Sequence, residues 1–198
     1  MFTTLQLATL PSLAATPEPT QNKTDTANQI SYITTMALSP DGNYLVSGGQ
    51  HQQQGIVKVW DLKKANGNRQ LHKSPAPEYN GHKHLVTSTA INHQRLIAAA
   101  DSSGIIKLWS AKEGYKWLIL TQTLQAHDSA VNTLAFNRTG TELASADQDG
   151  TVKLWQQGDK DQWHCTQTFT AHDQAITTIA FGADDRLLTG DIDGSVKL

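Results

Sequence analysis

Two carboxylates beside a glycine are the most chemically suggestive feature of the sequence. They occur in the stretch DQDGTVKLW at residues 147–155, where Asp147 and Asp149 precede Gly150. Alternating carboxylates in a tight loop could hold calcium, because calcium takes several oxygen ligands from such loops. They could also assist chemistry at a neighbouring nucleophile, or accept hydrogen bonds that fix a turn.

The calcium interpretation fails on the neighbouring residues. An EF-hand loop needs a carboxylate or amide two residues before the first aspartate and a glutamate at its twelfth position. The chain has Ser145 and Gln156 at those places. The sequence therefore favours a structural turn, and we expect no metal and no cofactor.

A hydrolytic site is the second chemical possibility, with Ser145 as nucleophile and the His127-Asp128 pair as its base. A triad also needs an oxyanion hole and an exposed nucleophile, for which the sequence offers no sign. Two short clusters, His82 with His84 and His164 with Cys165, lack the further Cys/His spacing of a zinc site. We expect them to be ordinary surface residues.

The acidic turn recurs along the chain. Related stretches are QQGIVKVW at 53–60, DSSGIIKLW at 101–109 and DIDGSVKL at 191–198. The tryptophans at 60, 109 and 155 are separated by 49 and 46 residues, and the histidines at 82, 127 and 172 are each 45 apart. Such regularity indicates a repeat architecture rather than a single active site.

Each repeat is predicted to contain four short β-strands. The first strand reads ITTMAL, VTSTAI, VNTLAF and ITTIAF in the four successive units. β-Branched residues at a period of two, bounded by Gly, Pro, Asn and Asp, favour strands, and no segment of the repeats carries a helical period.

Four-stranded units of about 45 residues with this His, Asp-Gly and Trp spacing resemble the blades of the WD-repeat (tryptophan–aspartate) β-propeller family. The resemblance covers residues from about Ile33 to Leu198, although Trp-Asp occurs only at Trp60-Asp61 and Gly-His only at Gly81-His82. It implies an all-β, open partial propeller of about four four-stranded blades, a fragment of a longer and usually seven-bladed member. The predicted division is an N-terminal segment at 1–30, which could add a closing outer strand, blades at 31–80, 81–125 and 126–170, and a truncated blade at 171–198.

The resemblance also implies a buried hydrogen-bonded chain of Asp, His, Ser or Thr, and Trp in each blade, so that every buried polar group has a partner. The third unit would supply His127, Ser145, Asp149 and Trp155, and the fourth His172, Thr189 and Asp193. The second keeps His82 and Trp109 but has Ala99 and Ser103 at the other two positions. The first keeps only Trp60, beside a longer, Gln-rich turn.

Bulk properties exclude several other classes of protein. The net charge of −2, from 16 basic and 18 acidic residues, gives no attraction to nucleic acid or anionic membranes. The single cysteine, Cys165, cannot form an internal disulfide, and no apolar run approaches the roughly 20 residues that span a bilayer. We expect a cytoplasmic protein, with secretion through the mildly apolar first 20 residues as the alternative.

Two further features lie between the repeats. The basic stretch KKANGNRQLHK at 63–73 is interpreted as a solvated loop insertion, with contact to an acidic partner as the alternative. Trp117 and Trp163 are expected to flank the outer strands, where packing is favoured over a role in partner contact.

The leading functional hypothesis is a noncatalytic scaffold that binds other proteins or peptides through the loops of one propeller face. The nominated residues on that face are Lys83, His84, Ser102, Asp128, Gln148, Asp173 and Ile192. The alternative is a ligand-binding or hydrolytic propeller with its site in the central channel. It would need convergent acids, bases or metal ligands, whereas the inner strands offer mostly Val, Thr, Ile and Ala.

Overall fold

The computed structural model describes residues 32–65, 68–73, 79–112 and 117–198. In this part of the chain, sixteen β-strands form four antiparallel sheets, and a single 3₁₀ turn (Asp159–Asp161) is the only helical element. Antiparallel meanders of this kind need only short turns, which the Gly- and Asp-rich stretches between the strands supply.

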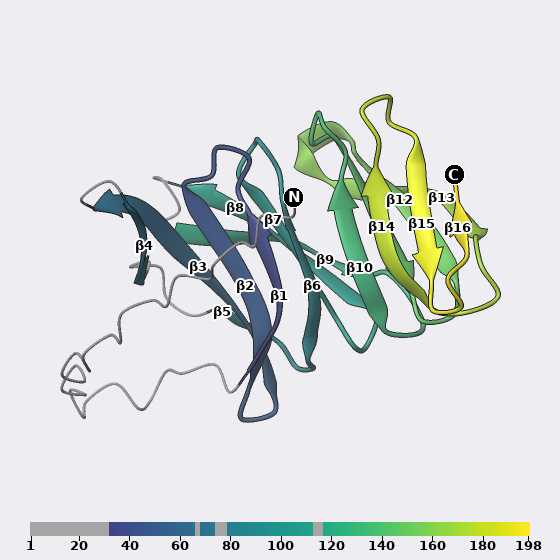
Figure 1. Ribbon diagram of the computed structural model, residues 1–198, viewed down its shortest axis with the longest axis horizontal. Helices are drawn as coiled ribbons and strands as arrows, with labels where there is room; N and C mark the ends of the chain where they lie inside the picture. The colour runs from purple at the N-terminus through teal and green to yellow at the C-terminus, as the bar shows by residue number, and fades with distance from the viewer. Residues whose placement is uncertain (1–31, 66–67, 74–78, 113–116) are drawn as a thin grey trace, which may run out of the picture.

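The strands follow one another in chain order within each sheet (Figure 1). The first sheet contains β1 (Tyr32–Leu38), β2 (Tyr44–His51), β3 (Gln54–Ala65), β4 (Asn68–Lys73) and β5 (Tyr79–His82). The second contains β6 (Val86–Ile91), β7 (Leu96–Asp101), β8 (Ile105–Lys112) and β9 (Trp117–Gln125). The third contains β10 (Val131–Phe136), β11 (Glu142–Asp147), β12 (Thr151–Gln157) and β13 (Trp163–Thr170), and the fourth contains β14 (Ile176–Phe181), β15 (Leu187–Asp191) and β16 (Val196–Lys197).

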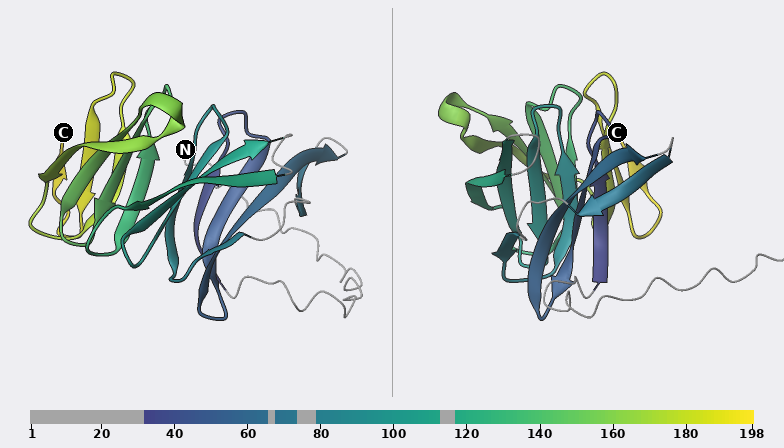
Figure 2. Two further views of the ribbon diagram at one scale, coloured as in Figure 1. Left: turned by 180° about the vertical axis from the view of Figure 1, so that it is seen from behind. Right: turned by 90° about the vertical axis from the view of Figure 1, so that its left-hand side faces the viewer.

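The four sheets stand side by side as blades, with the first and the last at opposite ends of the row (Figures 1 and 2). Their innermost strands contact one another in succession, β1 with β6, β6 with β10 and β10 with β14. This arrangement confirms the prediction of an all-β, open partial propeller of four blades.

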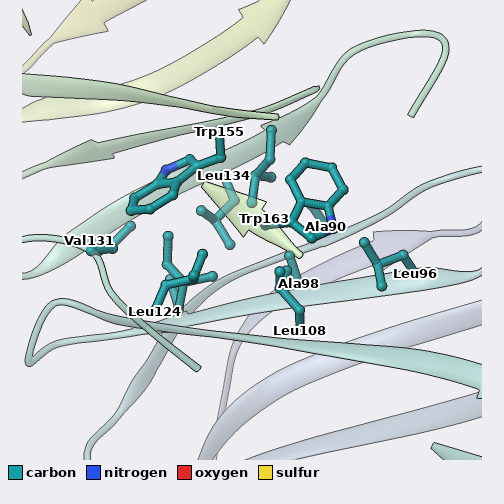
Figure 3. Close-up of a cluster of buried hydrophobic side chains, with 13 residues drawn as sticks. Ala90, Leu96, Ala98, Leu108, Leu124, Val131, Leu134, Trp155 and Trp163 are labelled. Atoms are coloured by element: carbon teal, nitrogen blue, oxygen red, sulfur yellow. The ribbon is translucent and has the colours of Figure 1, made fainter. Parts of the chain in front are cut away.

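The hydrophobic core lies in the layers between neighbouring blades. The layer between the second and third blades joins Ala98 and Leu108 to Leu134, Trp155 and Trp163 (Figure 3). A second layer packs Val46 and Val57 of the first blade against Ile97 and Trp109 of the second, and a third joins the last two blades. The second and third blades therefore bury both faces on their neighbours, and β7 is buried along its whole length, whereas the first and last blades each have one such layer.

The first and last sheets depart from four strands. In the first, β4 and β5 both pair with β3, so that they share the outer position. In the last, the described strands are three, β14, β15 and β16. The predicted N-terminal segment at 1–30 and its possible closing strand lie outside the described residues.

The interpretation of residues 63–73 as a solvated loop insertion was wrong. The described residues 63–65 and 68–73 belong to the paired strands β3 and β4, with Leu62 opposite Leu71 and Ala65 opposite Asn68. The two residues between this last pair are Asn66 and Gly67, and Asn-Gly is the strongest short signal for a two-residue hairpin turn.

The two outer tryptophans each begin an outer strand. Trp163 is 3% exposed and packs edge-on against Phe136, so packing was the correct expectation for this residue. Trp117 begins β9, and its side chain lies outside the described part of the structure. In the described ranges, no helix has the length and apolar character that a membrane crossing requires.

Candidate functional site

The third blade contains a complete buried hydrogen-bonded chain. The Trp155 indole N–H donates to the Ser145 hydroxyl at 2.9 Å, and that hydroxyl lies 2.7 Å from His127 Nε2. On the other side of the ring, His127 Nδ1 lies 2.8 Å from an oxygen of Asp147. All four side chains are buried. The chain joins the loop before β10 to β11 and β12, and every buried polar group in it has a partner.

The acid in this chain is Asp147, so the prediction of Asp149 was wrong. Asp147 ends β11 two residues after Ser145, and residues two apart in a strand project from the same face. Asp149 is exposed in the turn, where only its backbone N–H takes part, donating to Asp147 Oδ1 at 3.0 Å. Thr151 N–H donates to the same oxygen at 2.8 Å, so one carboxylate fixes both the histidine and the turn.

The fourth blade repeats this arrangement with Thr189 in place of serine. His172 Nε2 lies 2.8 Å from the Thr189 hydroxyl, and Nδ1 lies 2.9 Å from Asp191. The predicted acid, Asp193, is again two residues too late. Its backbone N–H donates to Asp191 Oδ1 at 3.0 Å.

The second blade also has an acid in its hydrogen-bonded chain, contrary to the prediction, because Asp101 lies 2.7 Å from His82 Nδ1. The predicted position, Ser103, donates its hydroxyl to Asp101 at 2.7 Å instead. What the blade lacks is the central hydroxyl, since this position is Ala99. His82 is consequently buried rather than a surface residue, and its Nε2 has no hydrogen-bond partner among the described residues. Its ring packs 5.7 Å from that of Trp109.

The first blade retains one bond of the chain. The Trp60 indole N–H donates to the buried Ser47 hydroxyl at 2.8 Å. The expected Gln-rich turn is a lengthened β2–β3 hairpin in which Gln52 and Gln53 adopt positive φ angles of 46° and 68°. In this blade, therefore, the Trp60–Ser47 hydrogen bond links the third strand to the second, and the lengthened turn contributes no acid to the chain.

Burial and hydrogen bonding act in opposite directions on the ionisable groups of these chains. Burial raises the pKa of Asp101, but hydrogen bonds from His82 and Ser103 outweigh it and lower the pKa to about 2. For His127, burial outweighs the hydrogen bond to Asp147 and lowers the pKa of the imidazole. Asp101 is therefore charged and His127 neutral at pH 7.

A lysine on the third strand is a further member of the repeat that sequence reasoning missed. Lys197 Nζ donates to the Ala171 carbonyl at 2.6 Å, and Lys107 Nζ donates to the Gly81 carbonyl in the same way. Each carbonyl belongs to the residue before the buried histidine. The recurring V-K-L or I-K-L before the tryptophan position was a signal that could have revealed this role.

The seven nominated contact residues are all exposed at one rim, formed by the loops before the inner strands and by the turns after the second strands. They are Lys83, His84, Ser102, Asp128, Gln148, Asp173 and Ile192. In the second, third and fourth blades one backbone hydrogen bond ties the turn to the loop. Ser102 N–H donates to Leu85 at 2.9 Å, Gln148 N–H to Ala130 at 2.9 Å and Ile192 N–H to Ala175 at 3.0 Å. The structure thus brings the nominated residues of a blade together on one framework.

The rim is hollowed beside the second blade. A cavity of about 260 Å³ is lined there by Lys83, His84, Ser103 and Lys107, among others. Ser145, the candidate nucleophile, is fully buried and hydrogen-bonded, so it does not face this or any other open surface. Within the described residues, no three His, Cys, Asp or Glu side chains gather as a metal site would require. The geometry therefore presents a rim of exposed polar side chains on hydrogen-bonded loops.

Comparisons with known proteins agree with this geometry. The Vps8 beta-propeller family matches residues 76–198, and the WD domain, G-beta repeat, matches residues 21–61. Transducin beta-like protein 3 of Bos taurus is 30% identical over 123 residues, covering 62% of this chain and 14% of the relative. The target of rapamycin complex subunit wat1 of Schizosaccharomyces pombe is 25% identical over 135 residues, covering 68% of this chain and 38% of the relative.

Solved structures extend the comparison. Sqt1 from Chaetomium thermophilum superposes with a TM-score of 0.66 at 17% identity over 83% of this chain, which shows likeness of fold alone. The computationally designed Ika8 protein gives a TM-score of 0.62 at 26% identity over 83% of this chain. The chain spans 43% and 44% of these two chains, and 14% to 38% of the length of the relatives named above.

The family match over residues 76–198, the sheet order and the repeated Asp–His–hydroxyl geometry all support the same assignment. This chain belongs to the WD-repeat β-propeller family and, within it, matches the Vps8 beta-propeller.

Proposed function

We propose that this chain is a noncatalytic protein-interaction scaffold, and that its partners contact the rim that carries Lys83, His84, Ser102, Asp128, Gln148, Asp173 and Ile192. The observation that carries the proposal is the contrast between the residues of the hydrogen-bonded chains and the residues next to them in the same turns. In the third and fourth blades the polar groups that could do chemistry are hydrogen-bonded to one another, while the residues beside them in the same turns are exposed. Loops held on a fixed frame need little further ordering of their backbone when a partner binds, and such frames favour recognition.

The named relatives support protein partners in particular. One is a subunit of the target of rapamycin complex, another is a small ribosomal subunit protein of Oryza sativa that is 25% identical over 128 residues, and a similar chain occurs in the structure of the mitotic checkpoint complex. Each of these proteins works within an assembly. The fold likewise supports a protein-binding propeller, and by analogy we assign the rim of this chain the same kind of role.

Charge reversal on the rim tests the proposal. The variant Asp128→Lys with Asp173→Lys changes two exposed rim carboxylates that take no part in the buried chains. In affinity capture from a lysate of the source organism, read out by quantitative mass spectrometry, we expect the proteins that the wild type retains to be depleted.

The matched control reverses Asp159 and Asp184, which are exposed on connections at the opposite ends of the strands. It should retain the wild-type set of proteins. If the rim variant and the control retain the same proteins in the same amounts, partners do not use the rim and the proposal is wrong.

A further inference from the structure

The hairpin formed by the end of β3 and by β4 is unlike any other element of the molecule. β3 has 12 residues, whereas the corresponding third strands β8 and β12 have 8 and 7. Its pairing with β2 ends at Asp61, opposite Tyr44, and from Lys63 to Ala65 it pairs only with β4. Two strands thus continue beyond the edge of the blade, at the outer end of the row (Figure 1).

This hairpin concentrates positive charge. Between Asp61 and Glu78 the sequence has four cationic residues and no carboxylate. They are Lys63, Lys64, Arg69 and Lys73. Because the whole chain has a net charge of −2, the remainder carries −6, and the hairpin is a positive element on a negative protein. The register places Lys64 opposite Arg69, so cations occur on both strands of the hairpin.

β4 also has a free edge. Among the described strands it pairs with β3 alone, and the six residues Asn68–Lys73 leave one side of its backbone without a strand partner. An unpaired edge is a template on which another extended chain can add. Cations on an edge oppose addition of a second copy of the same strand, since like charges would then face one another. They favour an acidic strand for the same reason.

From the free edge and the charge together we infer that β4 is a strand-addition site for an extended, acidic protein segment. A peptide can satisfy the unpaired backbone groups of β4 as well as its charges, whereas a nucleic acid or a lipid headgroup can meet only the charges. The remaining surface is also net negative, which opposes a polyanion longer than the hairpin. This surface is distinct from the rim, because β3 begins at the rim turn and the hairpin lies at its other end.

The probe for this inference is a fluorescent peptide of about ten glutamates, which spans β4 at about 3.3 Å per residue. Its binding to the full chain is followed by fluorescence anisotropy at low salt. The hairpin variant Lys63→Ser, Lys64→Ser, Arg69→Ser should bind about tenfold more weakly. A control with the same loss of charge, Arg95→Ser, Lys112→Ser, Arg138→Ser, removes three exposed cations of the second and third blades and should bind within about twofold of wild type. Unchanged thermal unfolding of both variants shows that neither result comes from misfolding.

A second peptide separates strand addition from simple charge attraction. In alternating Glu-Pro with the same number of glutamates, proline removes the backbone donors that a new strand would use. We expect it to bind much more weakly than polyglutamate. Equal binding of the two peptides, no binding of polyglutamate to the wild type, or tighter hairpin-dependent binding of a single-stranded RNA oligonucleotide would each overturn the inference.

Discussion

At the scale of the residue, the decisive feature is the position of one carboxylate in each turn. Asp101, Asp147 and Asp191 end the second strand of their blades, and each accepts from a histidine and from the backbone of the turn. The second carboxylate of the acidic turn, at Asp149 and Asp193, is exposed. A buried acceptor that loses its partners is costly, whereas an exposed one is solvated by water. The two acids of DQDG therefore differ in energetic role although they look alike in sequence.

Substitution of these two acids separates their roles. We expect Asp147→Ala to lower the free energy of unfolding by roughly 2–4 kcal/mol, because it leaves His127 and two turn N–H groups without an acceptor. Asp149→Ala should change it by less than about 0.5 kcal/mol. Urea unfolding of both variants measures the difference. Equal effects would show that Asp147 is not the structural acid.

The incomplete chain of the second blade predicts a stabilising substitution. Ala99→Ser places a hydroxyl where Ser145 and Thr189 stand in the next two blades, within reach of the unpartnered His82 Nε2. The free energy of unfolding should rise by roughly 0.5–1.5 kcal/mol. The neighbouring Ala98→Ser is the control, because Ala98 is equally buried but faces the apolar cluster of Leu108 and Trp155. It should destabilise by roughly 1–3 kcal/mol, since its hydroxyl would lack a partner. If both changes destabilise, the His82 site does not accept the missing group.

The lowered pKa of His127 makes stability depend on pH. The folded protein binds a proton at His127 less readily than the unfolded chain, whose histidine pKa is about 6.5. This contribution is therefore present above about pH 6.5 and is lost as the pH falls through and below that value. Urea unfolding at about pH 7.5 and 5.5 should show a smaller drop in stability for His127→Gln than for the wild type. An equal drop in the two proteins would contradict the assignment.

At the scale of the element, the turn glycines Gly104 and Gly150 each join one blade to the next. The Gly150 carbonyl accepts from the backbone N–H groups of Ala171 and His172 at 2.9 and 3.2 Å, and the Gly104 carbonyl accepts from Ala126 and His127 at 3.0 Å each. A side chain has no room at these positions. A Cβ on Gly150 would lie 1.9 Å from the His172 carbonyl oxygen. The glycine is thus required for close approach as well as for its positive φ angle of 81°.

A comparison of two glycines separates these two requirements. Gly194 has nearly the same φ angle, 84°, but a Cβ there would meet nothing within 4 Å. Gly194→Ala should therefore cost only the backbone strain of roughly 1–2 kcal/mol. Gly150→Ala should cost more than about 3 kcal/mol, because the contact with His172 must also be broken. Thermal or urea unfolding measures the two losses of stability. Equal losses would mean that the backbone around His172 moves away from the new Cβ at no cost.

At the scale of the whole molecule, the blades are linked on their inner strands by a repeated side-chain hydrogen bond. The pairing of each inner strand with its neighbour shifts at one residue, which is Thr34, Thr87, Asn132 or Thr177. The first three of these side chains donate to the carbonyl of the first inner-strand residue in the following blade. Those carbonyls belong to Val86, Val131 and Ile176. Since each blade contacts only its neighbours, these bonds add to the apolar layers in making the row unfold as a unit.

Removal of one such link tests its contribution. Thr87→Val keeps the shape of the side chain but removes the hydroxyl that bonds to Val131 of the third blade and to Ala100 of its own. It should lower the free energy of unfolding by about 1–2 kcal/mol. The control is Thr177→Val, whose hydroxyl bonds only within its own blade, to Gly190 at 3.2 Å, and which should cost about 0.5 kcal/mol. Urea unfolding compares the two, and an effect of Thr87→Val no larger than that of the control would show that the link does not stabilise the assembly of blades.

The sequence by itself determined the period, the strand-forming segments, the glycine turns and the tryptophans. These features are local, because alternation, turn chemistry and recurrence can be read within one unit. The Asn-Gly of the β3–β4 hairpin was equally local and was overlooked in a stretch dominated by lysine. The alternation of Ser145 and Asp147 could also have identified the acid, because residues two apart in a strand lie on the same face.

Only the tertiary structure decided which groups meet across long separations. His127 finds Asp147 across 20 residues, and Thr87 finds Val131 across 44. In the described part of the chain, the lack of a partner for His82 Nε2 and the unpaired edge of β4 likewise depend on how the neighbouring strands are placed. The physical reason is that a hydrogen bond depends on distances of a few tenths of an ångström, which follow from how the sheets pack and not from spacing along the chain.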